Sequence, residues 1–198
     1  MRAPVVRCGR PFGGFPELSG AGIITRVIAV LNVHERPLPV TPDRVGALID
    51  SLGSEHDRLW PPDWPPLRFE RPLTVGVSGG HGPVRYVVSH YVPGRWVRCR
   101  FTGPPGFDGF HEFSLEGLDD GRTVLRNTLV VRPRGVRWLA WALIVRPLHD
   151  AAFERGMDCA ERALTGRVAR PVECGWYVRL LRSAAFRRTG WDIRKNGP

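Results

Sequence analysis

The feature that most restricts the fold of this chain is a two-residue hydrophobic period that begins near Leu73 and continues to about Arg132. Apolar and polar residues alternate there over short stretches, which is typical of β-strands with one buried face. Turn-forming residues separate the stretches, and Pro93-Gly94 fits the centre of a type II turn. Short strands joined by tight turns predict an antiparallel meander. The predicted strands are 73–78, 84–92, 95–102, 110–116 and 123–132.

The segment before the meander predicts one further strand and one or two short helices. Val27–Glu35 is rich in β-branched residues and favours a strand. Thr41 is a good N-cap for a helix that starts at Pro42, and apolar residues recur at helical spacing until Gly53. Ser54–Leu59 is a candidate for a second short helix. The proline-rich stretch 60–66 cannot be helical and predicts an extended loop that carries two tryptophans.

The segment after the meander predicts a long helix over 136–164, kinked near Pro147. Its acidic residues fall on one side, and small residues such as Ala152 and Gly156 fall on the other. A helix lined by small side chains fills little volume. If it lies across a curved sheet, it leaves a hollow for a ligand.

Charge divides the chain into three parts. The formal net charge of +10 splits into +3 for 1–26, +1 for 27–166 and +6 for 167–198. A nearly neutral centre argues against nucleic acid as a partner of the domain. The pattern predicts a flexible basic arm at 1–26, one domain at 27–166, to which the family resemblance given below assigns ligand binding, and a basic tail at 167–198. An apolar stripe beside arginines in the tail is typical of an amphipathic helix. The tail is expected either to dock on the domain or be disordered, or else to contact a membrane surface or a polyanion.

Cysteine spacing and hydropathy favour a cytoplasmic protein. The four cysteines are scattered and form neither a C-x-x-C pair nor a disulfide framework. The longest apolar run, Trp138–Val145, is far too short to span a bilayer.

Three segments carry a resemblance to a known family, together with the order of predicted elements: Asp57-Arg-Leu-Trp60-Pro, Gly79 to Tyr86 and Arg146-Pro-Leu-His-Asp150. The chain resembles the START-like helix-grip (SRPBCC) superfamily, in particular its polyketide cyclase/dehydrase and lipid-transport branch in actinobacterial proteins. The resemblance implies an α+β fold in which a curved antiparallel sheet of about six or seven strands wraps around a long C-terminal helix. It also implies an apolar pocket for a lipid, a polyketide or a similar molecule, and many members of the family have no catalytic activity.

Strand alternation selects the residues that face this pocket. Three faces of the sheet, the proline-rich loop and the last helix supply the predicted ligand contacts: Trp60, Tyr86, His90, Cys99, Phe101, His111, Phe113, His149 and Phe153. At the cavity mouth we expect His81, Arg85 and Trp64, the tryptophan as an apolar lid. Neighbouring helical residues point about 100° apart, so His149 is expected on the pocket side and Asp150 on the solvent side.

No motif fixes a reaction. The six histidines lack zinc-like spacing, so neither a metal nor another cofactor is expected. Gly76-Val-Ser78-Gly-Gly80 matches a nucleophile elbow, but a strand follows where that motif needs a helix. The leading hypothesis is a module that binds a hydrophobic small molecule. One alternative is a cyclase or dehydratase that uses a pocket His or Tyr as acid-base. A third hypothesis is a membrane-surface or polyanion adaptor that works through the basic termini.

Overall fold

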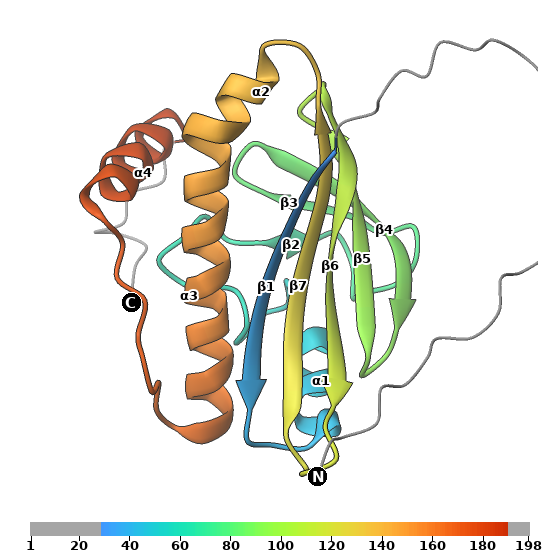
Figure 1. Ribbon diagram of the computed structural model, residues 1–198. Coiled ribbons are helices and arrows are strands. Elements are labelled where there is room, and N and C mark those ends of the chain that lie inside the picture. Colours follow the sequence, from blue (N-terminus) through green and yellow to red (C-terminus); the bar gives the residue numbers. More distant parts are fainter. Residues whose placement is uncertain (1–28, 190–198) are drawn as a thin grey trace, which may run out of the picture.

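A seven-stranded antiparallel sheet forms one layer of the protein (Figure 1). The computed structural model describes residues 29–189, and the predicted arm at 1–26 lies outside the described residues. The strand order is β1-β7-β6-β5-β4-β3-β2, so the chain runs as a meander from β2 to β7 and β1 pairs with β7. This confirms the predicted curved sheet of six or seven strands. The strands are β1 (Val30–Leu38), β2 (Arg68–Phe69), β3 (Ser78–His81), β4 (Val84–Val92), β5 (Trp96–Gly103), β6 (Phe107–Gly117) and β7 (Thr123–Pro133).

Alternation along the strands creates the inner face of the sheet. In β7 every second side chain from Thr123 to Val131 is buried, and the residues between them are partly exposed. The turn between β4 and β5 has Gly94 at φ +69°, the left-handed conformation that a type II turn requires. The apolar residues of the meander therefore lie on the inner face of the sheet, which the helices cover.

Helix α1 (Pro42–Asp50) closes one end of the sheet (Figure 1). It buries Val45, Leu48 and Ile49. Asp50 fixes its end to the β4–β5 turn by accepting hydrogen bonds from the Gly94 N–H at 2.8 Å and the Tyr91 hydroxyl at 2.9 Å. The end of the sheet that α1 covers is therefore filled by a packed hydrophobic core.

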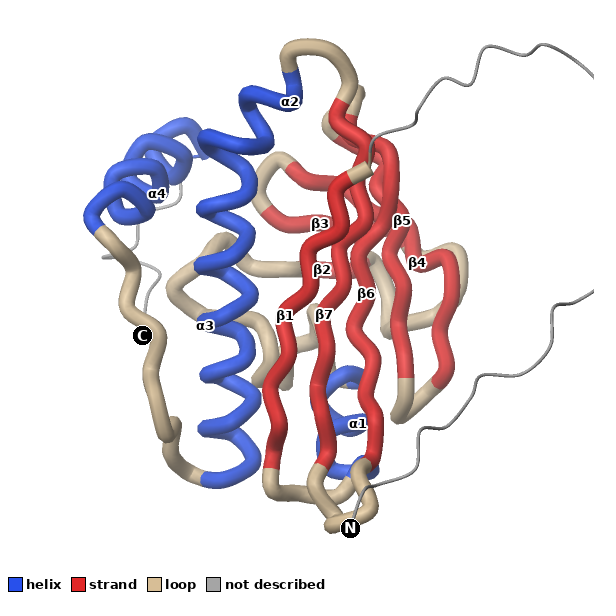
Figure 2. Tube along the Cα trace, in the orientation of Figure 1, coloured by secondary structure: helices blue, strands red, loops and turns tan. Residues whose placement is uncertain are grey.

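The long C-terminal helix lies alongside β1, as the tube in Figure 2 shows. It consists of α2 (Arg137–Ala140), a π-helical segment at Trp141–Val145 and α3 (Arg146–Thr165). The π segment falls immediately before the predicted kink, because Pro147 has no N–H to donate to the Leu143 carbonyl four residues earlier. The Tyr177 hydroxyl donates to that carbonyl instead, at 2.6 Å. Within the described part of the chain, no helix has the length and apolarity to cross a membrane.

After Gly166 the chain returns along α3 and forms α4 (Trp176–Thr189) against it. The predicted apolar stripe consists of Trp176, Tyr177, Leu180, Leu181 and Ala184. Trp176 and Leu180 on this stripe are exposed, while Arg182 and Phe186 lie on the face that packs inward. The packing face thus differs from the predicted one because Arg182 finds a partner, Asp63, on the proline-rich loop.

Two local predictions were wrong. Ser54–Leu59 forms turns instead of a helix, because the Asp57 carboxylate accepts hydrogen bonds from the backbone N–H groups of Gly53, Leu59 and Trp60. The predicted strand at 73–78 is also absent. The chain turns there with Gly76 at φ +90°, and β3 begins only at Ser78.

Candidate functional site

A cavity of about 310 Å³ lies between the inner face of the sheet and the long helix. Strands β4 to β7 form its floor, and the π segment with the first turns of α3 forms its roof. The proline-rich loop and the end of α4 close its sides through Trp60, Trp64 and Phe186. Its volume is at the lower end of the range for small-molecule sites, and its wall is almost entirely apolar.

Ala152 keeps the hollow open, because it places only a methyl group where α3 passes over the cavity. Further along the helix, Met157 and Ala160 are fully buried in the core. Gly156 has another role, since a Cβ atom there would lie 3.1 Å from the Leu59 carbonyl oxygen. It lets the loop approach the helix closely, so the small residues on this face serve two different purposes.

Aromatic rings from four elements line the inner part of the cavity. Phe153 of α3 is central: its ring centroid lies 5.9 Å from that of Trp60, 5.7 Å from that of His111 and 4.2 Å from that of His149. Tyr86 lies edge-on to His111 at 4.7 Å. Aromatic pairs in this range stabilise the wall, and their faces offer a large rigid contact area to an apolar ligand.

The Trp60–Trp64 loop is held in place by polar contacts at its back. The Trp60 indole N–H donates to the Pro65 carbonyl at 2.9 Å, and this turns the ring inward. The Arg182 guanidinium of α4 lies 4.7 Å above the Trp64 ring and donates to Asp63 at 3.0 Å. Both indoles are buried, so they form wall and closure together.

The three cavity histidines are neutral at physiological pH. Desolvation by burial lowers the pKa of His81 to about 3 and the pKa of His111 well below its ordinary value. Burial also lowers the pKa of His149, despite its contact with Asp150. Each neutral imidazole offers one N–H donor and one acceptor nitrogen. Burial also keeps Tyr86 a neutral phenol, because it raises the pKa of its hydroxyl well above the usual range.

Several of these polar atoms are buried without a hydrogen-bond partner. Among the described residues, they include both ring nitrogens of His111, both of His149 and the indole nitrogen of Trp64. A buried polar atom left unpaired costs about 1–3 kcal/mol. A ligand that carries oxygen or nitrogen atoms would recover this energy on binding.

The structure brings most of the predicted ligand-contact residues together. Trp60, Tyr86, Phe101, His111, His149 and Phe153 line the cavity, and so do the predicted mouth residues His81 and Trp64. Cys99 and Phe113 are buried in the core beside the cavity without lining it. Burial raises the pKa of the Cys99 thiol to about 12.

Two predicted contacts lie outside the cavity. A register shift between Val88 and His90 turns His90 to the outer face of the sheet, where its ring lies 5.3 Å from that of Trp96. A β-bulge of this kind reverses the expected alternation. Arg85 is exposed and folds back onto its own turn, where it donates to the Gly82 carbonyl at 2.7 Å.

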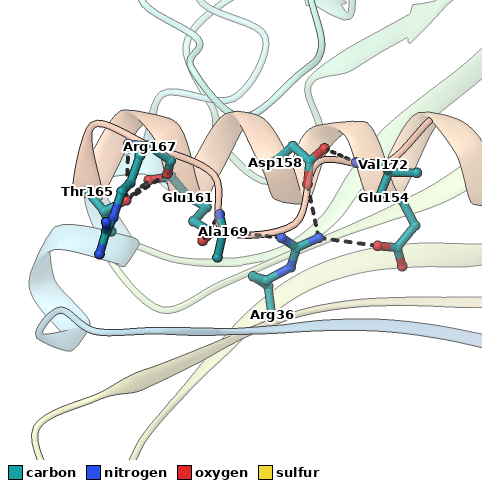
Figure 3. Close-up of polar contacts among 8 residues, drawn as sticks. All are labelled: Arg36, Glu154, Asp158, Glu161, Thr165, Arg167, Ala169 and Val172. Carbon is teal, nitrogen blue, oxygen red and sulfur yellow. Dashed lines mark hydrogen bonds and ion pairs between the residues drawn. The ribbon is translucent and has the colours of Figure 1, made fainter.

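A polar row between β1 and α3 escaped the sequence analysis. Arg36 contacts Glu161 at 2.6 Å, Asp158 at 3.1 Å and Glu154 at 3.4 Å (Figure 3). The backbone N–H of Val172 in the returning chain also donates to Asp158, at 2.8 Å. The sequence contains a pattern that indicates this row, because polar residues alternate in β1 and carboxylates recur along one side of α3.

His34 and Asp150 continue this row to the edge of the cavity. Asp150 points toward β1, contrary to its expected solvent side, and accepts a hydrogen bond from Asn32 at 2.9 Å. Burial lowers the pKa of His34, but its contacts with Asp150 and Glu154 outweigh this and raise the pKa overall. Burial likewise opposes ionisation of Asp150, and its contacts with His149, His34 and Asn32 still hold its pKa below the usual range.

Comparisons with known proteins agree with this geometry at the level of the fold. No protein-family model and no curated protein matches the sequence. The solved structure of CalU16 from Micromonospora echinospora is similar, with 12% identity, 83% of this chain and 91% of that chain covered, and a TM-score of 0.53. A solution structure from Thermobifida fusca has 14% identity, coverage of 73% and 99%, and a TM-score of 0.55. A norcoclaurine synthase from Thalictrum has 11% identity, coverage of 70% and 96%, and a TM-score of 0.52.

The fold and its cavity define a helix-grip protein. This is the fold that the resemblance to the START-like (SRPBCC) superfamily implied.

Acid should destabilise the protein through the cavity histidines. The folded-state pKa of His111 lies well below its ordinary value of 6.5, so the unfolded state binds more protons below that pH. The stability present above pH 6.5 is therefore lost as the pH falls, by up to about 1.4 kcal/mol per pH unit for one histidine. We expect His111→Phe to reduce this slope in urea unfolding curves recorded from pH 7 to pH 4. His90→Phe, outside the cavity, is the matched control, and an unchanged slope in His111→Phe would contradict the assignment.

Proposed function

We propose that this protein binds a hydrophobic small molecule that carries at least one oxygen or nitrogen atom. The observation that carries the proposal is an apolar cavity in which His111 and His149 have ring nitrogens without partners. An apolar body would contact the aromatic wall, and a carbonyl, hydroxyl or similar group would pair with these nitrogens. Lipids and polyketides both have this combination of groups.

The low pKa values of the cavity histidines favour binding of the ligand without chemical turnover. A general base works best when its pKa is near the working pH, and burial places the pKa of His81 at about 3. Neutral imidazoles orient a ligand well, since they donate and accept without a charge in an apolar site. The bound ligand is therefore expected to be released chemically unchanged.

A cyclase or dehydratase activity is the second candidate, and one contact favours it. The Nδ1 atom of His149 lies 3.8 Å from an oxygen of Asp150, so a small movement would form a histidine–carboxylate pair at the cavity wall. Such a pair could move a proton on a bound substrate. Incubation with the bound compound, followed by mass spectrometry of the extract, separates the candidates, because only the enzyme yields a new product.

The proposal also includes a cytoplasmic location and contact with a membrane surface. Three described cysteines, Cys99, Cys159 and Cys174, are free, which supports a cytoplasmic location. Exposed Trp176 and Leu180 on α4 support contact between the C-terminal segment and a membrane surface.

Native mass spectrometry of the purified protein tests the main proposal. We expect a population heavier than the bare chain by the mass of one small molecule, released into organic solvent. A protein that carries no such molecule and also fails to bind an apolar fluorescent probe, 1-aminoanthracene, would contradict it.

A further inference from the structure

A group of side chains at the edge of the cavity has the composition of a metal site. His34 comes from β1, and His149 and Asp150 come from the start of α3. One potential ligand atom of each lies within 4.8 Å of the other two. His34 is 8% exposed, and its Nε2 atom has no hydrogen-bond partner. The group thus combines a buried imidazole with a partly buried imidazole and a partly buried carboxylate.

Glu154 fixes the orientation of His34. Its Oε1 atom lies 2.7 Å from Nδ1 of His34, and a carboxylate can only accept, so Nδ1 carries the proton. The other nitrogen, Nε2, then faces an oxygen of Asp150 at 3.3 Å. In a neutral imidazole both of these atoms would be acceptors, so the contact is favourable only with a cation between them. That cation is either a second proton on His34 or a metal ion.

The spacing fits a metal ion. Zinc bonds of about 2.0–2.1 Å in tetrahedral geometry put neighbouring ligand atoms about 3.3–3.4 Å apart. The separation between His34 and Asp150 is 3.3 Å, and that between His149 and Asp150 is 3.8 Å. His149 has no hydrogen bond on either ring nitrogen, so nothing competes for its lone pair. Small side-chain movements would complete a three-ligand arrangement.

The surrounding contacts are those that hold metal ligands in place. A ligating histidine usually donates its second N–H to a carboxylate, as His34 does to Glu154. Asn32 donates to the ligand oxygen of Asp150 at 2.9 Å and fixes that carboxylate. His149 also lines the cavity, so an ion bound here would lie within reach of a cavity ligand.

We propose that His34, His149 and Asp150 bind one divalent transition-metal ion, for which Zn²⁺ is the best fit to two imidazoles and a carboxylate. This site shares His149 with the proposed site for the hydrophobic ligand, so Zn²⁺ binding and ligand binding are measured separately. An open coordination position beside the cavity is the arrangement that zinc sites use to contact a bound molecule.

Calorimetric titration of the full chain with Zn²⁺ at pH 7.5 tests the proposal, with Co²⁺ absorption as an independent readout of coordination. We expect one equivalent to bind. His149→Phe keeps the ring packing and should weaken binding at least about 100-fold, while Glu154→Gln should weaken it about 10–100-fold. His90→Phe, with its ring on the outer face, is the matched control and should bind as the parent does.

Two results would overturn the metal site. One is the absence of saturable one-to-one binding in the parent. The other is binding that survives in both His149→Phe and Asp150→Asn, which would place the ion elsewhere. Nitrogen NMR of His34 distinguishes the alternative, because a doubly protonated ring that Zn²⁺ does not perturb identifies the cation as a proton. Loss of the hydrophobic ligand in the mass-spectrometric test would leave Zn²⁺ binding unaffected.

Discussion

Ala152→Trp is expected to reduce binding of the cavity ligand at least about 100-fold. Ala152 lies on the inner side of α3 and lines a cavity of about 310 Å³, so an indole at this position occupies space that the ligand needs. Overpacking of this kind costs about 1–3 kcal/mol of stability, which a domain of this size tolerates. Titration with 1-aminoanthracene, and with the compound released from the purified protein, measures the change.

The control for this variant is Ala47→Trp, which adds the same ring to an exposed position of α1 away from the cavity. It should bind as the parent does. Ala185→Trp, on the part of α4 that lines the cavity, provides a second blocking variant if Ala152→Trp folds poorly. Unchanged affinity in folded Ala152→Trp and Ala185→Trp would show that the ligand binds elsewhere.

Arg36→Met is expected to lower the free energy of unfolding by about 3–5 kcal/mol. The Arg36 guanidinium lies between Glu161, Asp158 and Glu154, and the Asp158 side chain is only 4% exposed. Without the arginine, partly buried carboxylates face one another with no compensating charge. Breaking such a group costs far more than the intact pair contributes.

Arg126→Met is the matched control, because Arg126 belongs to neighbouring strand β7 and pairs with Glu35 and Glu116 on the exposed side. Its loss should cost less than about 1 kcal/mol. Urea unfolding at pH 7, followed by far-ultraviolet circular dichroism, compares the two. Equal losses in both variants would contradict the view that Arg36 anchors α3 to the sheet.

The overall fold could be predicted because its signals are local. The two-residue period from Val84 to Arg132 and the helical spacing after Thr41 each report on one element and its buried face. The order of those elements then leaves few topologies. Local signals failed where a single side chain changed the backbone, as the Asp57 carboxylate does before Trp60.

The candidate site could be predicted only in part, because sites are assembled from distant segments. Alternation placed Tyr86, Phe101 and His111 in the cavity, but one bulged residue was enough to move His90 to the other face. The pairing of His34 with Asp150 depends on how α3 lies along β1. The hydrophobic periods of the strand and of the helix do not determine how α3 lies along β1.

The position of α4 bears on how quickly a ligand can enter and leave. Phe186 and Ala185 belong to the cavity wall, yet α4 reaches it through a linker, and the Tyr177 and Arg182 contacts fasten it to the π segment and the proline-rich loop. Opening of α4 would uncover this side of the cavity, and both contacts would have to break for the helix to move away. The residence time of the ligand should follow the frequency of that opening, even when the equilibrium affinity is set by the aromatic wall.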